Sequence, residues 1–181
     1  MYGIVNKAIQ GLVSENFGED KWDLILDDSG VEEENFSSNQ PYDDEITYKL
    51  AISAGKVLEL PLEQVLFAFG EYWVLNTAQK HYGDLLKSGG HGFKEFMQNL
   101  PDFHSRVMMI YPNLTPPEFK VENVEDNQLD LHYISTRPGL KDFVSGLISG
   151  IGKYFQVNTQ SEIIASRDDG DKNEVYRIQW N

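Results

Sequence analysis

Over the first two thirds of the chain, apolar residues recur every three or four positions, the spacing of one face of an amphipathic α-helix. The first helix is expected from the start of the sequence, and its apolar positions are Met1, Ile4, Val5, Ala8, Ile9, Leu12 and Val13. Further helices are expected around Trp22 and at 44–58, 59–80, 93–100 and 101–111. The polar, turn-rich segment 27–45 is expected to be a loop.

The last third contains runs typical of β-strands. Strands are expected at 119–124, 128–136, 161–167 and 174–180, and the last two form a closing hairpin. Between the two pairs, 139–155 is a strongly apolar helix. The pattern predicts an α+β fold in a single domain, 1–181. A helical N-terminal subdomain spans 1–112, and a C-terminal subdomain with antiparallel sheet and helices spans 113–181.

Composition narrows the class of protein. Fifteen basic and 29 acidic residues give a formal net charge of −14, which disfavours nucleic acid and anionic membrane surfaces. No apolar run approaches the ~18 residues of a membrane span, and no signal peptide is evident. The absence of cysteine excludes disulfides and zinc–thiolate sites. Phosphate-binding, zinc-protease and serine-hydrolase motifs are missing, so no catalytic activity is expected. The lack of a membrane span, a signal peptide and cysteine leads us to expect a cytoplasmic protein.

Of the four histidines, His104 borders an apolar helical stripe, with Val107 and Met108 one turn further on. It could be a hydrogen-bonded residue at the edge of the core. It could also bind a metal. One histidine makes a poor zinc site, but it suffices as the axial ligand of haem iron, because the porphyrin supplies the other four donors.

The stretch "LHYISTR" (131–137) offers groups for the haem carboxylates. Strand alternation would place Tyr133, Ser135 and Arg137 on one face, with two hydroxyls and a guanidinium that pairs bidentately with a carboxylate. A polar, exposed strand face is the alternative interpretation. The apolar face of the helix at 139–155 could cover a flat ligand.

Together these stretches resemble the H-NOX family, the haem-nitric oxide/oxygen-binding domains related to the sensor domain of soluble guanylate cyclase. The resemblance covers essentially the whole chain. It rests on "MYGIVNKAI", "AFGEYW", "LPDFHSRV", "TPPEF", "YISTR", "GLISGIGKYF" and "YRIQW". It implies that haem b lies between the two subdomains and that the protein senses a gas.

The resemblance also implies individual roles. His104 matches the proximal iron ligand, and Pro117 matches the proline that presses on the porphyrin and distorts it. Tyr133, Ser135 and Arg137 match the propionate clamp. An acidic partner of the clamp arginine is expected at Asp43, although "PYDDE" offers Asp44 as well.

The residues on the distal side of the haem, opposite the proximal ligand, bear on which gas binds. Oxygen-binding members carry a tyrosine where this chain has Phe143; Ile9 and Trp73 take the supporting polar positions, and Val5 and Leu147 complete an apolar pocket. The resemblance thus implies a sensor of NO, also binding CO, that signals to a separate partner such as a histidine kinase or a cyclic-di-GMP enzyme. An O₂ sensor or carrier on the same scaffold and a haem-free interaction module are the alternatives. The indole N–H of Trp73 is the only evident donor nearby.

Overall fold

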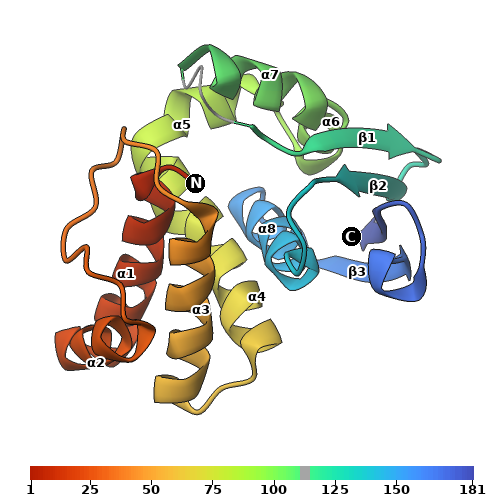
Figure 1. Cartoon of the computed structure of the whole chain (residues 1–181). Coiled ribbons are helices and arrows are strands. Elements are labelled where there is room, and N and C mark those ends of the chain that lie inside the picture. Colours follow the sequence, from red (N-terminus) through yellow and green to blue (C-terminus); the bar gives the residue numbers. More distant parts are fainter. Residues whose placement is uncertain (111–114) are drawn as a thin grey trace.

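The computed structural model describes residues 1–110 and 115–181, and Figure 1 shows how its elements are arranged. The helices are α1 (Gly3–Phe17), α2 (Glu19–Ser29), α3 (Asp44–Leu58), α4 (Leu62–Tyr72), a π-helical segment η1 (Trp73–Ala78), α5 (Gln79–Ser88), α6 (Phe93–Gln98), α7 (Leu100–Ile110) and α8 (Lys141–Tyr154). The strands are β1 (Glu118–Glu122), β2 (Gln128–Ile134), β3 (Thr159–Ala165) and β4 (Glu174–Trp180), with a 3₁₀ turn, η2 (Arg167–Asp169), before β4. The expected α+β class is confirmed.

Local chemistry sets the helix ends. The Asp43 carboxylate caps α3 by accepting a hydrogen bond from the backbone N–H of Glu45 at 3.0 Å. Gly30 ends α2 in the left-handed conformation, at φ 62°. The helix expected at 44–58 is confirmed at both ends. Within the described parts of the chain, no helix has the length and apolar character needed to cross a membrane.

The uninterrupted helix expected at 59–80 is wrong in two respects. Helix α4 begins at Leu62 rather than at Glu59, and Pro61 is its N-cap residue. The regular helix then gives way at Trp73 to six residues of π-helix. A π-helical turn holds more residues than an α-helical turn, so the side chains after it point in a new direction. Six residues are too few for apolar spacing to reveal such a change.

The four strands form one antiparallel sheet in the order β1-β2-β4-β3. Alternation along β2 buries Leu129, Leu131 and Tyr133 in the cluster that includes residues of α8. β3 and β4 pair as the expected hairpin. The strand expected at 128–136 is too long, because β2 ends at Ile134. Ser135 and Arg137 therefore lie beyond the sheet, where strand alternation no longer sets their direction.

Most buried apolar residues of the described chain belong to one of two clusters. One contains residues of the four helices α1, α2, α3 and α4, among them Ile9 and Leu50. The other joins α5, α6 and α7 to the sheet and α8, and it includes Phe96 and Ile148. Trp73 packs against both clusters, so the division between them lies near η1. The subdomain boundary expected at 112/113 lies outside the described residues.

Candidate functional site

A cavity of about 260 Å³ lies where the two apolar clusters meet. The start of α1, η1, α5 to α8 and the first two strands supply its walls, and in Figure 1 these elements surround one region of the molecule. Most of the lining side chains are aliphatic or aromatic. The lining residues with polar side-chain atoms other than sulfur are Tyr2, Trp73, Tyr82, His104, Thr115, Tyr133 and Arg137. Such a cavity suits a large apolar ligand with few polar groups.

α7 presents His104 to this cavity. The ring nitrogen Nδ1 lies 3.1 Å from the backbone carbonyl oxygen of Leu100, one helical turn earlier. Because a carbonyl can only accept, Nδ1 carries the proton and the lone pair resides on Nε2. The ring packs 4.7 Å from that of Phe119, centroid to centroid. Burial lowers the pKa of His104, outweighing the opposing effect of the Leu100 carbonyl. A neutral imidazole with a free Nε2 is prepared to bind a metal ion.

The donors near His104 decide which metal group would fit. Across the described ranges, no group of three or more histidine, cysteine, aspartate or glutamate side chains could hold a metal ion. His104 Nε2 also makes no hydrogen bond to another described residue. A single imidazole on an apolar wall fits a metal that brings its own planar donors, as haem does. The residues present therefore fit the haem that the sequence leads us to expect.

Arg137 lies at the polar part of the lining. Its Nε donates to Asp44 Oδ2 at 2.6 Å, and its Nη1 donates to the backbone carbonyl of Thr115 at 2.7 Å. Of the two aspartates left open by the sequence, Asp44 pairs with the arginine, while Asp43 caps α3. The guanidinium has five N–H groups, so donors remain for a carboxylate ligand.

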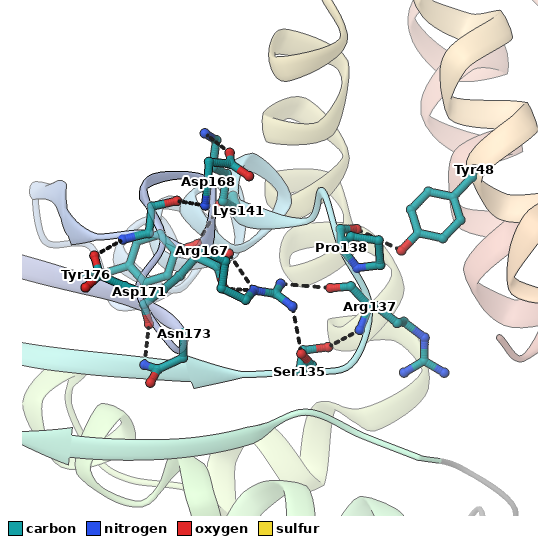
Figure 2. Close-up of polar contacts among 12 residues, drawn as sticks. Tyr48, Ser135, Arg137, Pro138, Lys141, Arg167, Asp168, Asp171, Asn173 and Tyr176 are labelled. Carbon is teal, nitrogen blue, oxygen red and sulfur yellow. Dashed lines mark hydrogen bonds and ion pairs between the residues drawn. The ribbon is translucent and has the colours of Figure 1, made fainter.

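Tyr133 and Ser135 differ in their placement. Tyr133 is 3% exposed and lines the cavity, and burial raises the pKa of its hydroxyl, which stays protonated and able to donate. Ser135 does not line the cavity. Its Oγ accepts a hydrogen bond from the Arg137 backbone N–H at 3.1 Å, as Figure 2 shows. The hydroxyl thus shapes the turn that carries Arg137.

The remaining expected site residues also differ in whether they line the cavity. Pro117, Val5, Trp73, Phe143 and Leu147 all line the cavity. The Phe143 ring packs 4.8 Å from that of Phe69, centroid to centroid, which fixes it against the N-terminal cluster. Ile9 is 2% exposed and belongs to that cluster, outside the cavity lining. Val5, Phe143 and Leu147 offer no hydrogen-bond donor from their side chains.

Some residues of the site carry no signal in the sequence. Thr115 supplies a carbonyl to Arg137, and Arg167 donates to the carbonyls of Ser135 and Arg137. Backbone acceptors leave no mark on residue type, and Arg167 follows a strand 30 residues after Arg137. Tyr2 also lines the cavity, and only its place in "MYGIVNKAI" could have pointed to it.

Comparisons with known proteins give matches over most of the chain. A family model described as haem-NO-binding matches residues 2–163. The chain is 33% identical over 157 residues to soluble guanylate cyclase gcy-32 of Caenorhabditis elegans, covering 84% of this chain and 23% of that protein. The chain spans about a quarter of the length of the curated relatives it matches.

Two solved structures share the fold. An H-NOX protein from S. oneidensis in its Fe(II)NO ligation state gives a TM-score of 0.89 at 21% identity, covering 100% of this chain and 99% of that one. An oxygen-binding H-NOX domain related to soluble guanylate cyclases, in its oxygen complex, gives 0.82 at 18% identity, covering 100% and 95%. Because one holds NO and the other oxygen, the fold by itself does not decide which gas binds.

Proposed function

Because the chain belongs to the haem-NO-binding (H-NOX) family and is a haem gas-sensor domain of the soluble guanylate cyclase type, we propose that it binds haem b and senses nitric oxide in preference to O₂. One observation carries the proposal. The neutral His104, whose Nε2 makes no hydrogen bond within the described residues, lies on the wall of an apolar cavity that Tyr133 and Arg137 also line. When bound, haem supplies the iron to which a diatomic gas binds.

Each protein group has a defined task in this proposal. His104 is the protein ligand of the iron, oriented by the hydrogen bond to Leu100. Tyr133 and Arg137 donate to the propionates, and Ser135 shapes the turn between them. Pro117 is a rigid contact on the face of the porphyrin. The aliphatic and aromatic walls keep water from the iron.

The proposed preference for NO rests on three lining residues whose side chains have no donor. A dioxygen ligand develops more negative charge than NO or CO and gains more from a hydrogen bond. Val5, Phe143 and Leu147 provide none. Withholding one donor from such a ligand costs it about 1–3 kcal/mol of affinity. The distal residues thus favour NO, with CO as a second ligand.

The proposed signal passes to a separate protein. The chain corresponds to the sensor part of relatives that are guanylate cyclases. It covers 23% to 26% of the length of three of them. The proposed output is a change in the activity of a partner protein in the cytoplasm, such as a histidine kinase or a cyclic-di-GMP enzyme. The net charge of −14 suits a partner with a basic surface.

Replacing the iron ligand tests the proposal. His104→Gly should bind haem weakly, and added imidazole should restore binding by occupying the space left by the ring. His91→Gly, an equal substitution at an exposed loop position, is the control and should retain haem as the wild type does. Haem content after reconstitution and gel filtration is the measurement. Equal haem content in His104→Gly and wild type would contradict the assignment of His104.

Trp73 supports a second candidate function, an O₂-binding haem sensor on the same scaffold. Its side chain lines the cavity, and its indole N–H makes no hydrogen bond to any described residue. If this N–H reaches the gas, the wild type forms a stable oxygen complex that Trp73→Phe loses. If Val5, Phe143 and Leu147 set the environment, Trp73→Phe leaves gas binding unchanged. Absorption spectra of both reduced proteins in air separate the two functions.

A further inference from the structure

The segment that carries Arg137 leaves the sheet before it reaches the cavity. β2 pairs with β1 as far as Ile134 and with β4 as far as Tyr133. Beyond these residues, no strand of the described ranges 1–110 and 115–181 pairs with the segment that contains Ser135 and Arg137. Unpaired carbonyls would leave this segment free to shift. A side chain takes the place of the missing strand.

That side chain is Arg167 of η2. Its Nη1 donates to the Ser135 carbonyl at 2.8 Å, and its Nη2 donates to the Arg137 carbonyl at 2.9 Å. Figure 2 shows the guanidinium of Arg167 beside this backbone, while the side chain of Arg137 points away from it. One planar group therefore holds the two carbonyls on either side of Thr136.

Arg167 is itself anchored. Its Nε donates to both carboxylate oxygens of Glu174, at 2.9 Å and 3.0 Å. The Glu174 side chain is only 4% exposed, and a buried carboxylate requires its cation. Glu174 lies opposite Tyr133 in the sheet. The residue that holds Arg167 is therefore paired with a strand residue that lines the cavity, as Arg137 does.

The backbone around Arg167 is also fixed. The hydroxyl of the buried Ser166 accepts a hydrogen bond from the Asp168 backbone N–H at 3.3 Å. Asp168 also pairs with Lys141 at 2.6 Å. The Arg167–Glu174 pair is neutral as a whole, so its effect on the cavity is one of position rather than of net charge.

We propose that Arg167, fixed by Glu174, is a positioning residue for haem. It does not line the cavity, but it holds the backbone from which Arg137 reaches the haem carboxylates. The inference rests on the proposed function and adds a residue to the Tyr133, Ser135 and Arg137 set. Lysine cannot replace it, because one ammonium lacks the planar fork that bonds two carbonyls and a carboxylate together.

Arg177 supplies a matched control. On the same strand as Glu174, it donates from Nε and Nη2 to Asp130 at 2.9 Å and 3.0 Å, and the Asp130 side chain is 3% exposed. It therefore makes an ion pair with an equally buried carboxylate but bonds no carbonyl of the 135–137 segment. Arg177→Lys measures the cost of altering such a pair, and Arg167→Lys adds the loss of the carbonyl contacts.

The test is the rate of haem loss to a large excess of apomyoglobin, measured with haem and with haem dimethyl ester. The ester lacks free carboxylates, so it cannot report on how Arg137 is placed. With haem, Arg167→Lys should lose the cofactor about tenfold faster than wild type. With the ester, the two proteins should agree within about twofold. Arg177→Lys should stay within about twofold of wild type with either cofactor.

The outcomes are distinguishable. If wild type binds no haem, the proposed function fails and this inference fails with it. If wild type binds haem and Arg167→Lys loses it at the wild-type rate, only this inference fails. Equal acceleration with haem and with the ester would also overturn it, because the effect would then be general loosening. Arg167→Met/Glu174→Leu removes both charges, which guards against misfolding, and should show the same contrast between the two cofactors.

Discussion

Asp44 interacts with two positively charged groups at the cavity edge. Its carboxylate accepts from Nε of Arg137 at 2.6 Å and from the amino group of Met1 at 2.5 Å. Burial acts to raise the pKa of Asp44, but Arg137 and the amino group outweigh it and hold the pKa below its ordinary value. Asp44 therefore stays charged at neutral pH and orients Arg137, which lines the cavity.

This shift predicts a pH dependence of stability. A carboxylate whose pKa is lower in the folded state stabilises the fold above its unfolded pKa of about 3.9, and this stability is lost as the pH falls through the folded pKa. Asp44→Asn should thus be less stable than wild type at pH 7, and the difference should vanish in strong acid. Urea unfolding of the haem-free proteins across this pH range is the measurement.

Asp43→Asn is the control for that experiment. Asparagine caps helices as well as aspartate does, so stability at pH 7 should change little. A difference between Asp44→Asn and wild type that persisted unchanged from neutral pH into acid would show that the ion pair is not its source.

Single residues of the site were predictable where chemistry restricts the choice. His104 was singled out because its imidazole borders an apolar stripe, and the structure places it on the cavity wall. Its role as iron ligand comes from the resemblance to the H-NOX family and stays a prediction. Arg137 was found from its guanidinium, but the strand argument behind it was wrong, because β2 ends at Ile134. Arg167 was missed, because its partners are carbonyls, which every residue has.

At the scale of elements, α4 and α8 pack at unusually close range through glycines. A Cβ added to Gly146 would lie 2.0 Å from the backbone oxygen of Phe67, and one added to Gly70 would lie 2.2 Å from that of Phe143. Both contacts are to backbone, which cannot yield without moving a helix. This packing sets the place of Phe143 and Leu147 on the cavity wall.

Gly146→Ala should therefore lower the free energy of unfolding by about 1–3 kcal/mol, because the two helices must separate. Gly83→Ala in α5 is the matched control. Its added Cβ would meet nothing within 4 Å, so the better helix propensity of alanine should leave stability equal or raise it by up to about 1 kcal/mol. Thermal and urea unfolding measure both. Equal stability of Gly146→Ala and wild type would contradict the close packing of α4 on α8.

The elements that sequence predicted well are those with local signals. α3 has a capping aspartate and a regular apolar face, so both its ends were predictable. The β3–β4 hairpin was also predictable, since its strands flank a polar turn. The π-helical η1 was not, because six residues are too few for apolar spacing to distinguish a π-helix from an α-helix.

At the scale of the whole molecule, α3 ties the N-terminal cluster to the segment that follows β2. Asp44 and Tyr48 lie one helical turn apart on α3. Asp44 pairs with Arg137, and the Tyr48 hydroxyl donates to the Pro138 carbonyl at 2.9 Å. Trp73 packs against both apolar clusters. In the proposed function, a change at the iron ligand alters these contacts and shifts the two clusters relative to each other. The partner protein recognises that shift.

The absorption spectrum of the reduced, haem-loaded protein tests the central claim most directly. The spectrum is recorded without gas, in air and with NO. An NO-selective haem sensor should show a Soret band in all three states, a shift of that band with NO and no stable oxygen complex in air. A stable oxygen complex in air would contradict the preference for NO, and the absence of any Soret band after reconstitution would contradict the haem sensor itself.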